Sequence, residues 1–208
     1  FIPSDAQVSR AIVDSLLNLD GRVHIQIFHD ACVNLGNMPA TSARQFVTKL
    51  AKIIQEDGEI GLLDALLIER VKAELHLLPM HTPSSLETVK PQIVRLIDAL
   101  LHVQQINSAN QLEVRYQILD RVLSKDELEL FEDISDEPID IGEILNDISG
   151  LLLRDRLSIL GVAEICLWHD RIITQDELDV LELLYWRLGF KTEEIVDQMQ
   201  KKNSVIIV

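Results

Sequence analysis

Two short acidic stretches contain the side chains of this sequence with the clearest chemical potential. The first holds Asp57, Glu59 and Asp64, and the second holds Asp170 and Glu177. Carboxylate oxygens are the ligands that hard cations such as Ca²⁺ and Mg²⁺ prefer in proteins. These residues therefore form a candidate site for a weakly bound divalent cation, and the sequence indicates no other cofactor.

The spacing of the first acidic stretch does not fit the calcium-binding loop of EF-hand proteins. With Gly58 at loop position six, positions one and three would be Ile53 and Gln55, which cannot supply the carboxylates that such loops need. Helix capping is the alternative interpretation. An Asp-Gly pair favours a turn, and a carboxylate at a helix N-terminus is stabilised by the helix dipole without any metal.

The sequence contains no recognisable catalytic motif. None of the six histidines lies in the H-E-x-x-H pattern, which places two zinc ligands and a glutamate base on one helix face. Neither Cys32 nor Cys166 has a histidine nearby in a nucleophile signature, and the eight glycines do not form a phosphate-binding loop. We therefore expect no catalytic residues and no enzyme activity in this chain.

An acidic run and one aromatic side chain are the candidate binding sites for a protein partner. Residues 126–137 contain seven carboxylates, including Asp126, Glu127 and Glu129, and could dock a basic partner. Trp168, Tyr185 and Trp186 lie near the second hairpin, and Trp186 best fits an exposed position, where an aromatic side chain could be a binding hot spot. The alternatives are a solvated helix face for the acidic run and core packing for the tryptophan.

The composition predicts a sizeable core beneath an acidic surface. The chain has 208 residues and 47% hydrophobic content, and its net charge of −15 disfavours nucleic acid and anionic membranes as partners. Charged residues interrupt every apolar run before it reaches the roughly 18 residues that cross a bilayer, so we expect no membrane insertion. Both cysteines lie in apolar stretches, which predicts buried free thiols in a reducing, cytoplasmic compartment.

Helical periodicity runs through most of the sequence, and few strand-like alternations compete with it. The segments Ser124 to Glu127 and Thr174 to Glu177 fit capping boxes, in which a hydroxyl and a carboxylate satisfy backbone donors at a helix start. Breaks separate the helical segments, and the strongest is 78–85, which contains two prolines. We predict an all-α fold of about ten antiparallel helices joined by short connections.

An internal repeat relates two helical hairpins at an offset of 113 residues, the sequence distance from Asp57 to Asp170. In each copy an apolar helix ends at an acidic turn, an isoleucine is placed to tuck under the corner, and an acidic residue begins the next helix. The offset also aligns Ile60 with Ile173 and Asp64 with Glu177. The sequence therefore predicts two hairpin units of similar design.

The hairpins resemble those of tellurite-resistance B-like (TerB-like) domains. The segment Ile54-Gln-Glu-Asp-Gly-Glu-Ile60 and the acidic helix after it carry the resemblance in the first copy. The segment from Trp168 to Glu177 carries it in the second copy, although Arg171 replaces the glycine of the turn. The resemblance implies two TerB-like units, the first in residues 1–80 and the second, with the inter-repeat helices, in residues 81–208.

Most of the chain also resembles the cytoplasmic C-terminal region of HtpX-related bacterial membrane zinc metallopeptidases, where two such units follow the catalytic domain. Residues 22–28 resemble the first helix of that region, residues 89–103 its inter-repeat helix, and residues 152–188 its second unit. The resemblance implies that an H-E-x-x-H domain belongs to a longer parent chain. The first residue, Phe1 rather than a methionine, fits one piece of a longer protein.

Three functions are open on these grounds. The first is a stress-related, non-catalytic module that binds a protein partner or the rest of its parent chain. The second is the cytosolic tail of a membrane zinc metallopeptidase, and the third is a divalent-cation-binding TerB-like domain. We expect the first, because the repeat is regular and catalytic motifs are missing. The sequence does not indicate an oligomeric state.

Overall fold

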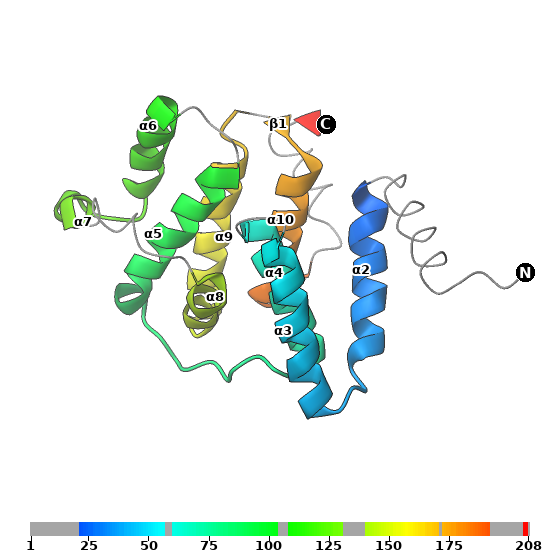
Figure 1. The fold of residues 1–208 in the computed structure, drawn as a ribbon. Coiled ribbons are helices and arrows are strands. Elements are labelled where there is room, and N and C mark those ends of the chain that lie inside the picture. The colour runs from blue at the N-terminus through cyan, green and yellow to red at the C-terminus, as the bar shows by residue number, and fades with distance from the viewer. Residues whose placement is uncertain are drawn as a thin grey trace, which may run out of the picture.

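Nine helices make up nearly all the regular structure in the described part of the chain. The computed structural model describes residues 21–56, 60–103, 108–130, 140–170, 172–191 and 206–207. Its elements (Figure 1) are α2 (Gly21–Leu35), α3 (Ala40–Glu56), α4 (Leu62–Glu74), α5 (Leu86–Val103), α6 (Ser108–Leu119), α7 (Lys125–Leu130), α8 (Ile141–Ser149), α9 (Leu153–Leu167), β1 (Ile172–Ile173), α10 (Gln175–Arg187) and β2 (Ile206–Ile207). The predicted all-α fold is confirmed. No helix of these residues is both long and apolar enough to cross a membrane.

The helix boundaries follow local signals in the sequence. The hydroxyl of Thr174 accepts a hydrogen bond from the Glu177 N–H at the start of α10, as the capping box predicts. Asp140 caps α8 in the same way through the Glu143 N–H, at 3.1 Å. The proline-containing stretch between α4 and α5 is free of helix, so the strongest predicted break is confirmed.

Three helix boundaries fall at corresponding residues in the two halves. α4 and α10 both have 13 residues, and the offset of 113 relates both their first and their last residues. The same offset relates the first residues of α3 and α9, Ala40 and Leu153. The repeat found in the sequence is therefore also a repeat of helix boundaries.

The C-terminal ends of α4 and α10 share one backbone geometry. His76 and Gly189 follow these helices with φ angles of 55° and 86°, in the left-handed region common at helix ends. The long backbone hydrogen bond of a Schellman motif closes each end, from Leu77 to Lys72 at 2.8 Å and from Phe190 to Tyr185 at 2.9 Å. The offset of 113 relates these ends as well, so the two copies match in conformation at this helix end.

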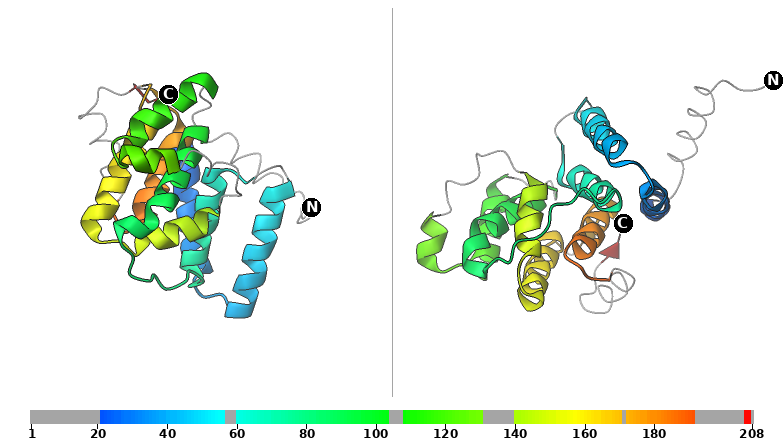
Figure 2. Two further views of the ribbon diagram at one scale, coloured as in Figure 1. Left: turned by 90° about the vertical axis from the view of Figure 1, so that its left-hand side faces the viewer. Right: turned by 90° about the horizontal axis from the view of Figure 1, so that it is seen from below.

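Helices α4 and α10 pack against each other at the centre of the molecule. Helix α5 packs along both α8 and α9, and α4 also contacts α2, α3 and α8 (Figures 1 and 2). The main core combines Leu62 and Leu66 of α4 with apolar side chains of helices α5 to α10. Residues on both sides of position 80 thus share a core, and the boundary between units at 80/81 stays a prediction.

A second, smaller cluster lies between α2, α3 and α4. Its buried members are Cys32, Ala43, Val71 and Leu75. Helix α3 stands at one side of the molecule (Figure 2, left), and Ala43 is its only buried residue. Because so little of α3 is buried, its packing depends on this small cluster.

At the second turn, the short strands β1 and β2 pair in parallel. Ile172 pairs with Ile206 and Ile173 with Ile207. The prediction that an isoleucine tucks under each turn is confirmed for Ile173, which is 1% exposed. It is wrong for Ile60, which is 41% exposed, whereas Ile173 belongs to the main core.

Candidate functional site

Two of the predicted cation ligands cap helices. The Asp64 carboxylate accepts a hydrogen bond from the Gly61 N–H at the start of α4, at 3.2 Å. The Glu177 carboxylate accepts from the Thr174 N–H at 2.7 Å and from its hydroxyl at 2.9 Å. Glu177 is also buried, with 6% of its surface exposed. Both carboxylates therefore accept hydrogen bonds from backbone N–H groups at helix N-termini. This is the helix-capping role that the sequence analysis gave as the alternative to cation binding.

The other three predicted ligands are not brought together by the described residues. Asp170 is exposed, and its carboxylate accepts a hydrogen bond from the Ile172 N–H at 2.9 Å. Asp57 and Glu59 lie outside the described residues. Within the described ranges, no group of three or more histidine, cysteine, aspartate or glutamate side chains is arranged to hold a metal. Cation binding by the acidic turns stays a prediction.

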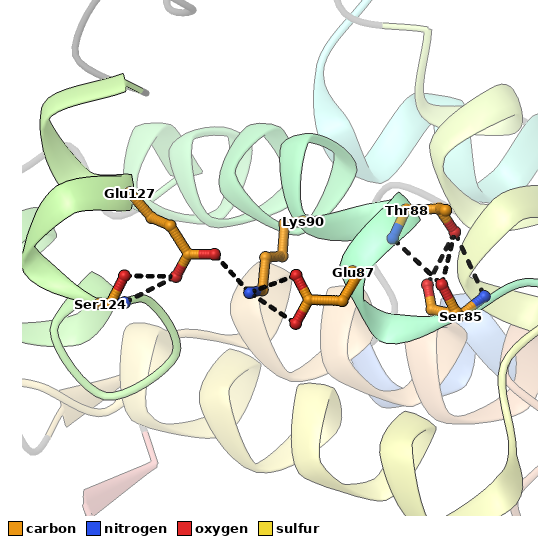
Figure 3. A network of polar contacts seen from close by, with 6 residues as sticks. All are labelled: Ser85, Glu87, Thr88, Lys90, Ser124 and Glu127. Atoms are coloured by element: carbon orange, nitrogen blue, oxygen red, sulfur yellow. Dashed lines mark hydrogen bonds and ion pairs between the residues drawn. The ribbon is translucent and has the colours of Figure 1, made fainter.

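The acidic run contributes a polar network that ties α7 to α5 (Figure 3). Glu127 accepts hydrogen bonds from the ammonium group of Lys90, at 2.5 Å, and from the Ser124 N–H, at 2.8 Å. Lys90 also contacts Glu87 of its own helix at 2.8 Å. Of the other predicted partner residues in this run, Asp126 is exposed, and the side chain of Glu129 lies outside the described part.

These contacts set the charge state of Glu127 and Lys90. The Lys90 hydrogen bond, followed by those of Ser124, lowers the pKa of Glu127 to about 2. The hydrogen bonds to Glu127 and then Glu87 raise the pKa of Lys90 above its ordinary value. Glu127 is thus an ionised helix cap and ion-pair partner, so only part of the acidic run is available to a basic partner.

Trp186, the predicted aromatic binding residue, packs on a cation. The guanidinium carbon of Arg70 lies 4.2 Å from the centroid of the indole ring, a cation–π contact between α4 and α10. Arg70 also pairs with Glu74 one turn further along α4, at 2.7 Å. The indole is half-buried, so its ring links the two central helices and leaves one part at the surface.

A buried ion pair lies between the same two helices. The Arg187 Nε donates to Glu69 at 3.4 Å, and their side chains are only 2% and 4% exposed. Arg187 also donates to the Ser149 hydroxyl of α8 at 2.9 Å, and Lys72 contacts Glu69 at 2.8 Å. Burial lowers the pKa of Arg187, and the Glu69 charge opposes that shift. The ion pair therefore connects α4 with α10, and the hydrogen bond to Ser149 connects both with α8.

The Glu69–Arg187 ion pair has no direct signature in the sequence. Glu69 and Arg187 are separated by 118 residues, and each lies beside apolar residues of its helix, like many solvent-facing charges. A weak signal was present in α4, where charged residues are distributed around the whole helix and leave no purely polar side. Such a helix is buried on several sides, and its charges then need partners.

A histidine and a cysteine of α2 face the same region of α4. His29 and Cys32 lie one helical turn apart, and Cys32 is fully buried. Burial and then the charge of Arg70 lower the pKa of His29, whereas Asp30 and Glu74 act in the opposite direction. The buried Nε2 atom of His29 makes no hydrogen bond to a described residue. The neutral imidazole is therefore the form that fits this packed region.

The lowered pKa of His29 predicts a loss of stability in mild acid. The folded state takes up a proton less readily than the unfolded state, so the contribution of neutral His29 is complete above the ordinary pKa of 6.5 and is lost as pH falls below it. We expect His29→Gln to reduce the loss of unfolding free energy between about pH 7.5 and about pH 5.5. Urea unfolding at both pH values measures this.

The exposed His102 of α5 provides the control for that measurement. His102→Gln removes an imidazole at an exposed position, so it is expected to leave the free energy of unfolding close to that of the parent protein. Equal pH dependence in the parent and the His29→Gln variant would contradict the assignment of the acid sensitivity to His29.

Both cysteines are free and buried, as the sequence predicts. Burial raises the pKa of Cys32, and it raises the pKa of Cys166 to about 12, with a further contribution from the nearby Asp98 charge. A thiol with a raised pKa is a poor nucleophile, since the thiolate is the reactive form. Both cysteines therefore act as small apolar side chains of the core.

Comparison with known proteins adds no homologue to this description. No protein-family model matches the chain, and neither a curated protein nor a solved structure matches it.

Proposed function

We propose that this chain is a non-catalytic helical module that binds a protein partner or the rest of its own parent chain. The observation that carries the proposal is the structural use of its charged side chains. Asp64 and Glu177 cap helices, Glu127 pairs with Lys90, and Glu69 pairs with Arg187. These contacts stabilise a scaffold of paired helices, and a preorganised scaffold loses little conformational entropy when it binds.

We infer further that the two hairpins, α3–α4 and α9–α10, are TerB-like units. The support is the resemblance of the turn sequences together with the shared helix boundaries and the shared helix ends. The likeness to the C-terminal region of HtpX-related metallopeptidases makes a membrane-anchored zinc peptidase the parent chain that we favour. In that setting the module lies in the cytoplasm and transmits a stress-related signal to the peptidase.

Chemical cross-linking in source cells tests this function. The product of the native gene, tagged at its own locus, is cross-linked, and its partners are identified by mass spectrometry. We expect reproducible cross-links from residues 21–191 to one partner protein or to another region of the same gene product. Cross-links that stay within this chain under every condition would contradict the proposal. An H-E-x-x-H helix encoded upstream would identify the parent as a metallopeptidase.

A further inference from the structure

Helix α2 is attached to the rest of the molecule by a small interface. It packs on α4 and less extensively on α10, and it stands at the outer side of both (Figures 1 and 2). Cys32 is the only fully buried side chain among those described in α2, and it belongs to the small cluster between α2, α3 and α4. Separation of α2 would therefore uncover little apolar surface and would cost only a small part of the free energy of unfolding.

Helix α4, on which α2 packs, is held in place independently of α2. It joins the main core through Leu62 and Leu66, and its Glu69 pairs with Arg187 of α10. None of these residues belongs to the small cluster. The main core can therefore stay folded while α2 separates from α4, as in the local opening of peripheral segments in other proteins.

His29 places a titratable group in this small interface. Its side chain is half-buried, one helical turn before Cys32, and its buried Nε2 atom has no hydrogen-bond partner among the described residues. The charged groups that act on His29 are Arg70 and Glu74 of α4 and Asp30 of α2 itself. None of the charges of α10, the other helix packed on α2, is among them. Burial and Arg70 together disfavour the imidazolium form more than the two carboxylates favour it.

Arg70 is fixed in its position near His29. Its Nη2 atom lies 2.7 Å from the Glu74 carboxylate, its guanidinium carbon lies 4.2 Å from the centroid of the Trp186 ring, and its side chain is only 11% exposed. Its buried Nε atom also lacks an acceptor within the described part of the chain. A protonated His29 would therefore add a second cation to a packed region, and separation of α2 would relieve both the repulsion and the desolvation of the imidazolium.

We propose that α2 is a pH-sensitive switch, in which protonation of His29 in mild acid releases α2 from α4 while the main core stays folded. Release uncovers the Cys32 thiol together with Val71 and Leu75 of α4, the other side chains of the small cluster at this interface. At neutral pH the closed form prevails, because a neutral imidazole tolerates burial near Arg70. This inference goes beyond the proposed function, since it describes a change within the chain that needs no partner.

Thiol labelling of the full chain without denaturant tests the switch, because the two free cysteines lie in different clusters. The chain reacts with dithiodipyridine at about pH 7.5 and about pH 5.5. Peptide mass spectrometry separates Cys32 from Cys166, and each rate is divided by the rate of the urea-unfolded chain at the same pH. We expect the normalised rate at Cys32 to rise severalfold in acid, up to about tenfold, the limit for one proton taken up by a group with the ordinary pKa of 6.5. Cys166 of the main core should react far more slowly at both pH values.

Two histidine variants assign the acid response to one residue. His29→Gln should remove most of the rise at Cys32, whereas His102→Gln should keep it, because His102 is exposed on α5, outside the small cluster. A rise that persists in His29→Gln would overturn the proposal. Equal normalised rates at Cys32 and Cys166 would overturn it as well, because a common rate means that the whole molecule unfolds.

Hydrogen exchange of the parent protein gives a second measurement, which needs no variant. After correction for the intrinsic pH dependence of exchange, the amides of residues 27–35 should lose protection at about pH 5.5, while those of α10 keep theirs. A parallel loss of protection in α2 and α10, or no loss in α2, would contradict a separate release of α2.

Discussion

Replacing Arg187 by methionine is expected to lower the free energy of unfolding by about 3 kcal/mol, because it removes the buried guanidinium group that pairs with the buried Glu69 carboxylate. Glu69 is 4% exposed at its side chain and, among the described residues, would keep its ion pair with Lys72, at 2.8 Å. The Ser149 hydroxyl would also lose the donor of a 2.9 Å hydrogen bond. Urea unfolding followed by circular dichroism gives the midpoint and slope needed for this comparison.

A double-mutant cycle with Glu69→Gln separates the ion pair from the loss of packing. If the two charges stabilise each other, the double variant should be less destabilised than the sum of the single variants by at least about 1 kcal/mol. Arg154→Met serves as the exposed control, since the Arg154 side chain is 85% exposed, and it is expected to have little effect. Additive effects of Glu69→Gln and Arg187→Met would contradict direct coupling.

Gly150→Ala is expected to be the second strongly destabilising substitution, by about 2 to 3 kcal/mol. Gly150 ends α8 beneath the connector between α4 and α5, and the Ser84 N–H donates to its carbonyl at 3.1 Å. A Cβ atom at this position would lie 2.0 Å from the Thr82 carbonyl oxygen. Because that atom belongs to the backbone, the connector itself would have to move. Thermal unfolding measures the loss.

Gly161→Ala provides the matched control, for which we expect an increase in the free energy of unfolding. Gly161 lies inside α9, and a Cβ atom there would meet no atom within 4 Å. Alanine has a higher helix propensity than glycine, so this variant should gain about 0.5 to 1 kcal/mol. If Gly150→Ala proved as stable as the parent protein, the close approach of the connector to α8 would be contradicted.

Local features of this fold could be predicted from the sequence because they depend on neighbouring residues. The Thr174–Glu177 capping box needs only residues three positions apart, and it forms as predicted. The repeat was also visible, since Ile60 and Ile173 share their surroundings in sequence. The repeat could not show which of these apolar side chains other parts of the chain bury. Ile173 is buried and Ile60 is exposed, because burial depends on chain segments distant in sequence, such as β2, which pairs with β1.

In the candidate site, too, local features could be predicted from the sequence, whereas contacts between helices could not. Trp186 and Glu127 were identified as candidate partner residues, but their contacts with Arg70 and Lys90 cross between helices and have no local signature. The Glu69–Arg187 pair joins residues 118 positions apart, so only the packing of α4 on α10 reveals it. Periodicity indicates which side of a helix is apolar, whereas the identity of the facing helix comes from the tertiary fold.

The central position of α4 has a consequence for synthesis of the chain. Its matching partner α10 follows 113 residues later, a delay on the order of 10 s at ordinary rates of translation. During that interval Glu69 has no Arg187 to pair with, and Leu66 has no finished core around it. The first hairpin thus leaves the ribosome with apolar surface that stays uncovered until α10 has been synthesised.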